Sequence, residues 1–358
     1  MITPFRRLAL VLAALPALAA AGVSDDCRTD LDSIPAFMLE NDAGGRDVWN
    51  REGAAHFDQA LSEARAAVAS VADEPACTVA LRAYLRAWRP GHLGLRGAEP
   101  AKQASTRDDT PRVQWLSPQT ALLTLPSFDP KLREAVEQLL AKNHAELARR
   151  PNWIIDVRGN GGGSDSVYAS VLRWTGPLVA ADTQVEYLST AANIEATRQV
   201  CALFAPGDAE CEKSMQNERE RMQSVAPGSW VLQQAGDAYL TTRQPALEPK
   251  RPARVAILVD DACVSSCEQF LLDVRQSFSV KLVGQHSRGT LDYSNLRPHV
   301  LPSGRRTLMY AVTRTKRMPG MPVDGIGVMP DVYLPPEAVG VPADALVGRV
   351  REWLENKL

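Results

Sequence analysis

The sequence has no large excess of charge of either sign, because 40 lysines and arginines nearly balance 42 aspartates and glutamates in 358 residues. Proteins that bind nucleic acid need a basic excess clustered on one face, so nucleic acid is not an expected partner. Internal repeats and low-complexity tracts are also missing. With 45% hydrophobic and 23% charged residues, the composition is that of a globular, enzyme-sized protein rather than a disordered or fibrous one.

Long apolar runs are scarce, and the only marked one lies near the start, at residues 8–20. Arg6 and Arg7 precede it and small residues follow it, which predicts a signal peptide over residues 1–21. An uncleaved anchor is the alternative, although a spanning helix needs roughly 20 apolar residues. We therefore expect a periplasmic or secreted protein with no stable membrane span after the signal is removed.

Cysteine is limited to six residues, all beyond the expected signal peptide. An even number in an exported chain predicts disulfides. Local spacing favours pairing Cys201 with Cys211 and Cys263 with Cys267, which leaves Cys27 for Cys77; other connectivities stay open. A zinc site is the rival, but a C-x-x-C pair and a histidine cluster are both missing. We expect no metal and no organic cofactor.

Residues 22–105 read as a small N-terminal helical domain. Apolar residues recur there at helical spacing in two segments. These residues are Phe57, Leu61, Ala64 and Val68, followed by Leu81, Tyr84, Leu85 and Trp88.

The pattern changes over residues 106–340, where short buried strands alternate with helices. Strands are expected at 120–125, 153–157, 254–259 and 281–284, and a hairpin arm at 305–313. This alternation predicts an α/β core with parallel strands. A polar stretch at about 191–226 reads as a helical insertion in the core, and residues 341–358 as a C-terminal helix.

A glycine-rich turn, Asp156-Val-Arg-Gly-Asn-Gly-Gly-Gly163, follows the second buried strand. Consecutive glycines let the backbone approach a ligand, and their N–H groups can hold an anion or a developing oxyanion. The spacings of phosphate-binding loops do not occur here. A tight strand-to-helix turn without chemistry is the alternative for the turn taken alone.

Ser265 lies in a second strand-to-helix turn, Asp260–Glu268. With Glu268 three residues later, it fits a capping box at the start of a helix. The same place suits a nucleophile, because the turn exposes the hydroxyl and the helix N-terminus favours negative charge. The N–H of Ser266 would then point toward an oxyanion, and a Cys263–Cys267 disulfide would brace the turn.

A serine needs a base to react at neutral pH, and the chain has only five histidines. His92 lies in a glycine-flanked turn, Pro90–Leu95, that closes the helical region. His286, after the strand at 281–284, is a further candidate base, as is Lys281. Of the remaining three, His56 and His144 are expected at the surface or boundary of helices, and His299 is expected to be structural.

Together these segments resemble the serine peptidases that include C-terminal processing proteases, tail-specific proteases and the tricorn core. The resemblance covers roughly residues 80–335. It rests on four segments in family order: Trp153–Gly163, Ser265–Glu268, Leu282–Gly289 and Gly325–Asp331. It implies a ClpP/crotonase-like α/β core with parallel β-β-α units.

The resemblance also implies roles for individual residues. In the processing-protease style a lysine about 25 residues after the serine is the base, and that position is Thr290 here. In the tricorn-like style a histidine from a turn before the core is the base, which matches His92. Asp324 matches the acidic residue that orients the histidine or supports the site, where the tricorn-like pattern has glutamate. The span from His92 to Val113 is too short for the PDZ domain of the processing proteases.

The sequence thus predicts an exported serine-type peptidase (endopeptidase or other peptidase) that acts on peptide or protein substrates. Ser265 is the expected nucleophile, His92 the general base and Asp324 its orienting acid, with an oxyanion hole formed by Gly161, Gly162 and Ser266. Activity should rise as pH passes roughly 6 to 7, the ordinary range for a histidine base. Two alternatives stay open: a catalytically inactive peptide-binding protein that retains the fold, and an acyl-CoA enzyme.

Overall fold

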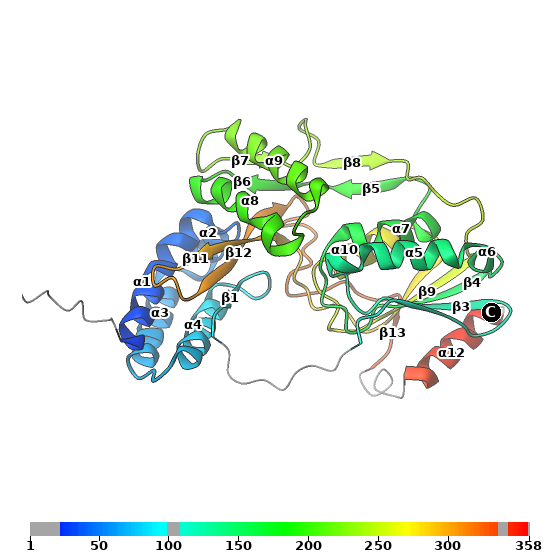
Figure 1. Cartoon of the computed structure of the whole chain (residues 1–358), viewed down its shortest axis with the longest axis horizontal. Coiled ribbons are helices and arrows are strands. Elements are labelled where there is room, and N and C mark those ends of the chain that lie inside the picture. Colours follow the sequence, from blue (N-terminus) through cyan, green and yellow to red (C-terminus); the bar gives the residue numbers. More distant parts are fainter. Residues whose placement is uncertain (1–21, 99–107, 336–342, 357–358) are drawn as a thin grey trace, which may run out of the picture.

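The computed structural model describes residues 22–98, 108–335 and 343–356. The predicted signal peptide, residues 1–21, lies outside this range. Figure 1 shows two halves: helices on an antiparallel sheet at one end, and a largely parallel sheet covered by helices at the other. Within the described residues no helix is long and apolar enough to cross a membrane.

Four helices form the N-terminal region, in agreement with its helical prediction: α1 (Val23–Asn41), α2 (Gly45–Glu52), α3 (Ala54–Ala69) and α4 (Glu74–Trp88). The Cys27–Cys77 disulfide joins α1 to α4. The helices share their core with strands much later in the chain, including Leu308 and Tyr310. The helical region is therefore packed onto the rest of the molecule rather than closed on itself.

The strands under these helices form a five-stranded antiparallel sheet. Its strands are β1 (Gly94–Arg96), β6 (Val185–Leu188), β7 (Trp230–Leu232), β11 (Tyr293–Val300) and β12 (Thr307–Thr315). The order is β1-β12-β6-β7, and β11 pairs with β12 as the predicted hairpin. β1, β6 and β7 were not predicted from the sequence, because each is only three or four residues long.

The second sheet has six strands in the order β13-β10-β9-β4-β3-β2. They are β2 (Arg112–Trp115), β3 (Thr120–Thr124), β4 (Asn152–Asp156), β9 (Arg254–Val259), β10 (Val280–Gly284) and β13 (Val332–Tyr333). All neighbours are parallel except β2 and β3. The predicted parallel strands are thereby confirmed.

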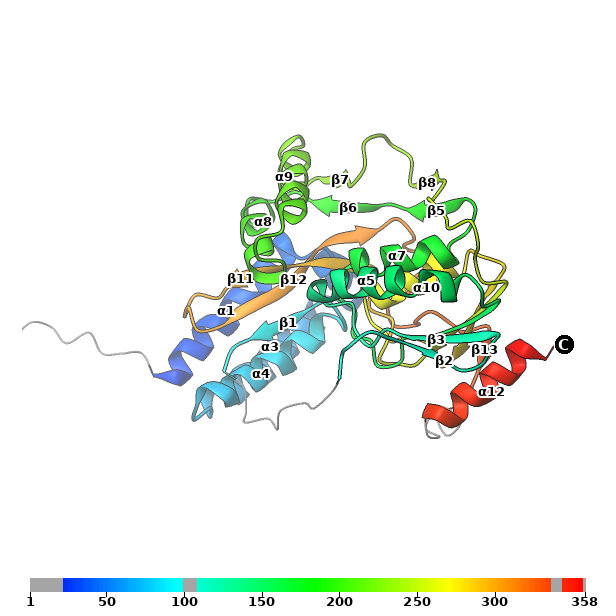
Figure 2. The ribbon, with the colours of Figure 1, turned by 45° about the vertical axis from the view of Figure 1, so that its right-hand side comes forward.

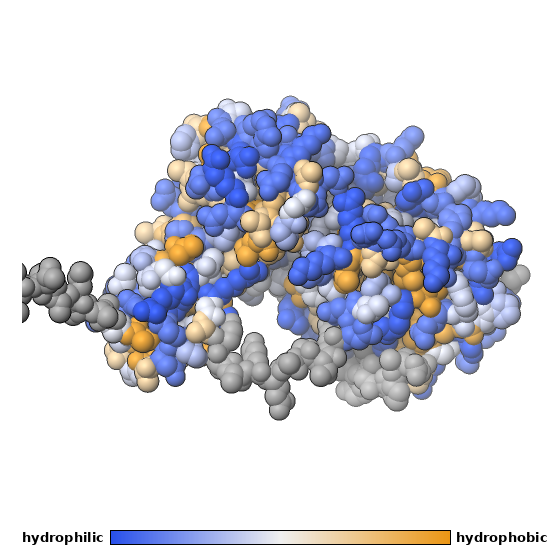
Figure 3. Space-filling view, viewed as in Figure 1, coloured by the Kyte–Doolittle hydropathy of each residue, from blue (hydrophilic) through white to orange (hydrophobic). Residues whose placement is uncertain are grey.

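Helices cover both faces of this sheet, with α5, α7 and α10 on one face and α12 on the other (Figures 1 and 2). The four covering helices are α5 (Arg133–Lys142), α7 (Asp165–Thr175), α10 (Ser266–Val274) and α12 (Ala343–Glu355). A short 3-10 helix at Pro130–Leu132 precedes α5, and the one-turn helix α6 (His144–Leu147) follows it. The expected C-terminal helix is present from Ala343. The outer face seen in Figure 3 is mostly hydrophilic, with separate small apolar patches.

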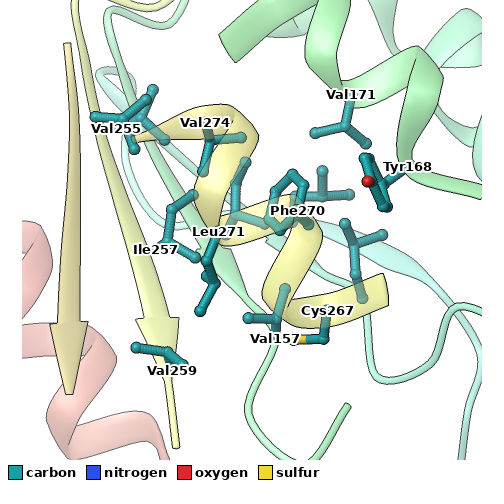
Figure 4. Packing of buried hydrophobic residues seen from close by; sticks show 14 of the residues in the cluster. Val157, Tyr168, Val171, Val255, Ile257, Val259, Cys267, Phe270, Leu271 and Val274 are labelled. Carbon is teal, nitrogen blue, oxygen red and sulfur yellow. The ribbon is translucent and has the colours of Figure 1, made fainter. Parts of the chain in front are cut away.

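Packing of α10 fixes the turn that precedes it. Phe270 and Leu271 are fully buried and lie between β9 and α7, as Figure 4 shows. Burying a side chain of this size contributes roughly 1.5–3 kcal/mol. Because β4 and β9 are parallel neighbours, the loops after Asp156 and Val259 emerge side by side at the same sheet edge. The glycine-rich turn and the Ser265 turn therefore meet.

The predicted insertion is a pair of helices, α8 (Ala191–Phe204) and α9 (Ala209–Gln223), joined by the Cys201–Cys211 disulfide. It stands against β11 in both views (Figures 1 and 2). Beside it, β5 (Ala180–Thr183) and β8 (Leu240–Arg243) form a two-stranded ribbon that the sequence analysis did not identify. With Cys263–Cys267, all three favoured disulfides are present.

Candidate active site

Ser265 lies at the start of α10 in a strained backbone conformation, with φ 60° and ψ −121°. A non-glycine residue rarely adopts positive φ, and such strain concentrates at functional sites. The Cys263–Cys267 disulfide closes the turn on both sides of the serine. The predicted capping box is also present, since the Glu268 carboxylate accepts the Ser265 N–H at 3.0 Å. These contacts therefore fix the turn, and the Ser265 hydroxyl points toward His92.

His92 reaches Ser265 although 173 residues separate them in sequence. The distance from His92 Nε2 to Ser265 Oγ is 2.7 Å, and from Nδ1 to the Tyr293 carbonyl oxygen it is 2.7 Å. A carbonyl can only accept, so Nδ1 carries the proton and Nε2 accepts the serine hydroxyl. This is the arrangement in which an imidazole can take a proton from a nucleophile.

Arg89, at the end of α4, holds the turn that carries His92. Its guanidinium donates to the carbonyl oxygens of Gly91 and His92 and forms two hydrogen bonds to Asp42, at 3.0 and 2.6 Å. Both side chains of the Arg89–Asp42 pair are almost fully buried. Sequence reasoning missed this pair, because nothing local distinguishes it from the many surface arginines and aspartates.

Burial and the nearby Arg89 charge lower the pKa of His92 to about 4, and the hydrogen bond to Tyr293 opposes them only in part. Burial penalises the charged form of an imidazole, and a neighbouring cation does the same. His92 is therefore neutral, and able to accept a proton, at any pH well above 4. The structure thus favours a lower pKa than the ordinary histidine value expected from the sequence.

Asp324 contacts backbone near the site rather than the imidazole, which fits the second of its two expected roles, support of the site. Its carboxylate accepts the backbone N–H groups of Leu291 and Asp292 instead. The Asp292 carboxylate in turn accepts the N–H groups of Val323 and Asp324 at 2.6 and 2.8 Å. These reciprocal bonds fix the segment whose next residue, Tyr293, presents the carbonyl to His92. Burial, with the nearby Asp292 charge, raises the pKa of Asp324 to about 6.

Thr290, at the place of the lysine base in the processing-protease style, lies close to both halves of the site. Its N–H donates to the buried Glu268 carboxylate at 2.9 Å, the same carboxylate that accepts the Ser265 N–H. Its side chain also fills the space beside Gly91, where a Cβ would lie 2.4 Å from Thr290 Cγ2. Glycine at position 91, with φ 66°, lets the His92 turn approach this closely.

The glycine-rich turn lies directly against the serine. A Cβ on Gly162 would lie 2.4 Å from the Val264 carbonyl oxygen and 2.9 Å from Ser265 Cβ. The Gly162 N–H donates to Asn160 Oδ1 at 2.9 Å. The Gly162 N–H, which the sequence placed among the expected oxyanion donors, is thus already bonded within its own turn.

Three other backbone amides near Ser265 are candidates to bind an oxyanion. Gly161, Gly163 and Ser266 line the cleft beside Ser265. Ser266 is the first residue of α10, where a backbone N–H has no partner within the helix. The Gly163 carbonyl accepts the Ser266 hydroxyl at 3.1 Å, which ties the two turns together.

The other candidate bases lie elsewhere. His286 Nδ1 bonds to the Ser287 carbonyl oxygen at 2.7 Å, and Lys281 is an exposed residue of β10. The three histidines that were not expected to act as the base also have other partners. His56 bonds the Ala87 carbonyl, His144 pairs with Glu248, and His299 stacks on Phe37.

The Ser265–His92 pair opens onto a cleft of about 1400 Å³. Its walls come from the glycine-rich turn, α7, α10, the β5–β8 ribbon and the helical insertion. A cleft of this size accommodates an extended peptide rather than only a small ligand. Within the part of the chain that the structure describes, no group of three or more histidine, cysteine, aspartate or glutamate side chains could hold a metal ion.

Comparisons with solved structures show the same fold in other proteins at low sequence identity. A candidate peptidase from Parabacteroides merdae is 14% identical with a TM-score of 0.60, covering 93% of this chain and 98% of that one. Mature CPAF in complex with lactacystin is 11% identical with a TM-score of 0.60, over 93% and 97%. A lipoprotein from Streptococcus agalactiae is 13% identical with a TM-score of 0.51, over 96% and 99%.

No curated protein sequence matches the chain at a significant level. The model of peptidase family S41 matches residues 119–334, well over half of the chain. The match includes the glycine-rich turn, Ser265 and Asp324, whereas His92 precedes it. The resemblance read from the sequence is confirmed: this chain belongs to peptidase family S41.

Proposed function

We propose that the protein is an exported serine-type endopeptidase in which Ser265 is the nucleophile and His92 the general base. The observation that carries the proposal is the 2.7 Å contact between Ser265 Oγ and His92 Nε2 in a peptide-sized cleft. Three disulfides fit an oxidising compartment, which supports export to the periplasm or beyond. The parallel sheet supports a ClpP/crotonase-like core.

The reaction begins when Ser265 Oγ attacks the carbonyl carbon of the scissile peptide bond. The serine proton passes to His92 Nε2, and Nδ1–H keeps its bond to the Tyr293 carbonyl, which holds the ring plane. The resulting imidazolium gives its proton to the leaving amine, and the peptide C–N bond breaks. Water, deprotonated by the same imidazole, then attacks the acyl-enzyme and releases the serine.

The negative charge on the tetrahedral intermediate needs donors fixed in advance. The Ser266 N–H is one, because it lies at the N-terminus of α10 next to the nucleophile. An amide of the glycine-rich turn, Gly163 or Gly161, is the second, since Gly162 is already bonded to Asn160. Removing one such donor costs on the order of 3 kcal/mol of barrier in related chemistry.

The orienting group for the histidine is a backbone carbonyl in this proposal, with Asp324 and Arg89 as positioning residues. A carbonyl fixes the tautomer but carries no full charge. The buried imidazolium therefore receives less stabilisation than it would from a carboxylate, which agrees with the low pKa of His92. A catalytically inactive peptide-binding protein would not need the contact between Ser265 and His92, and no observation favours this alternative.

The test is cleavage of a panel of internally quenched peptides by the wild type, Ser265→Ala and His92→Ala. Both variants should lose at least about a thousandfold in kcat, as for other members of such pairs. His286→Ala is the matched control, because this histidine bonds only within its own loop and should leave cleavage near the wild-type rate. Equal activity of Ser265→Ala and wild type would reassign the protein to peptide binding.

A further inference from the structure

Two carboxylates line the cleft that contains Ser265: Asp165, which is exposed, and Asp273, which is buried. Asp165 is the first residue of α7, and Asp273 lies near the end of α10. Both line the same cleft as Ser265 and Ser266. The hydroxyl of Tyr168 joins them, because it donates to Asp273 at 3.1 Å and also interacts with Asp165.

Neither carboxylate has a cationic partner among the described residues. Asp165 interacts with the hydroxyls of Ser266 and Tyr168, and Asp273 accepts Gln269 Nε2 at 2.8 Å. None of these partners is a cation. Asp273 is only 9% exposed, a degree of burial at which a carboxylate is rarely left without a cation.

The arginines that line the cleft are engaged elsewhere. Five of them already pair with other carboxylates: Arg133 with Glu137 and Glu210, Arg173 with Glu248, Arg243 with Asp182, Arg297 with Glu218, and Arg317 with Asp292. The sixth, Arg96, lies over the Phe204 ring. The negative charge at Asp165 and Asp273 is therefore left for something that enters the cleft.

The lack of a cation also shows in the titration of Asp273. Burial raises the pKa of Asp273 to about 6, and the nearby Asp165 charge contributes to the rise. A cation placed between them would reverse this effect. A lysine ammonium or an arginine guanidinium is a cation that a peptide substrate can supply.

We propose that Asp165 and Asp273 form a specificity pocket that selects a lysine or arginine side chain next to the scissile bond. The pocket adjoins the nucleophile, since Asp165 lies against Ser266, the residue after Ser265. Asp273 and the Tyr168 hydroxyl form its deeper end, reached by the long stem of a basic side chain. The proposal rests on the proposed function and adds to it the class of substrate.

The test compares two peptides that differ only in arginine or its neutral isostere citrulline beside the cleaved bond. The wild type should cleave the arginine peptide at least about tenfold faster in kcat/KM, and the difference should shrink with added salt. Asp165→Asn should reduce the ratio toward one mainly by slowing the arginine peptide. Asp58→Asn, which removes an exposed carboxylate on α3 far from the cleft, should leave the ratio unchanged.

Failure of the pocket and failure of the proposed function give different results. Labelling of Ser265 by a fluorophosphonate tests the nucleophile without any peptide, and it also shows that Asp165→Asn is folded. Binding of the two peptides to Ser265→Ala tests the pocket without cleavage. If Ser265 is labelled but neither cleavage nor binding prefers the arginine peptide, the pocket is overturned. An equal loss of kcat/KM for both peptides in Asp165→Asn also overturns it. Preferential binding without labelling or cleavage keeps the pocket and overturns the peptidase.

Discussion

Arg89 and Asp42 form a buried ion pair that connects the end of α1 to the turn carrying His92. Because Arg89 also donates to the carbonyls of Gly91 and His92, Arg89→Met should misplace the base and lower kcat by at least about tenfold. The unpaired Asp42 should cost roughly 3–5 kcal/mol of unfolding free energy. Loss of the Arg89 charge should raise the pKa of His92, so the acid limb of kcat/KM should move to higher pH.

The double variant Asp42→Asn with Arg89→Met separates the two effects. It leaves no unpaired charge and should recover part of the melting temperature, while the turn stays without its donor and kcat stays low. An Arg89→Met protein with lower thermal stability but an unmoved acid limb would show that Arg89 supports only the fold.

The acid limb of the wild type should lie near pH 4. The neutral imidazole is the active form, and the pKa of His92 is about 4, so the active fraction rises as pH increases through that value. Initial rates of peptide cleavage between pH 3 and pH 9 measure this limb directly. A limb near 6.5 would mean that His92 titrates as an ordinary histidine in the working enzyme, and one above 9 would indicate lysine.

Asp324 can be distinguished from a direct orienting acid by two substitutions. Asp324→Asn keeps a carbonyl oxygen that can accept the N–H groups of Leu291 and Asp292, so most of the activity should remain. Asp324→Ala removes the acceptor and should lose at least about tenfold in kcat, since a small misplacement of the base is costly. A loss of about 10⁴ in Asp324→Asn, as found when the acid touches the imidazole, would contradict the positioning role.

The Cys27–Cys77 disulfide should contribute mainly to stability, and the Cys263–Cys267 disulfide mainly to activity. Cys27 and Cys77 are 50 residues apart, whereas Cys263 and Cys267 are four apart. Chain entropy then predicts a loss of about 4 kcal/mol for the first pair replaced by serine and about 2 kcal/mol for the second. The second pair flanks Ser265, so its removal should lower kcat more. Chemical denaturation and peptide cleavage of both double variants measure the two effects. The prediction is contradicted if the same double variant shows the larger loss in both stability and kcat.

Much of the architecture follows from local patterns in the chain. The apolar spacing of Leu81, Tyr84, Leu85 and Trp88 predicted α4, and all four are buried. The turns after β4 and β9 were also recognisable, because a buried strand followed by glycines, or by Ser265-x-x-Glu268, has a signature within a few residues. The short strands β5 to β8 were not, since three or four residues with mixed exposure carry no clear period.

The sequence by itself determined the helices, the parallel strands, the two turns and the residue types able to act as nucleophile and base. Only the tertiary structure decided what surrounds His92: the Tyr293 carbonyl on Nδ1, the Arg89–Asp42 pair behind its turn, and Asp324 acting through Leu291 and Asp292. Every residue has a backbone carbonyl, so the one that orients a histidine leaves no mark in the sequence. Burial and neighbouring charge, which set the pKa of His92, likewise arise only when distant segments pack together.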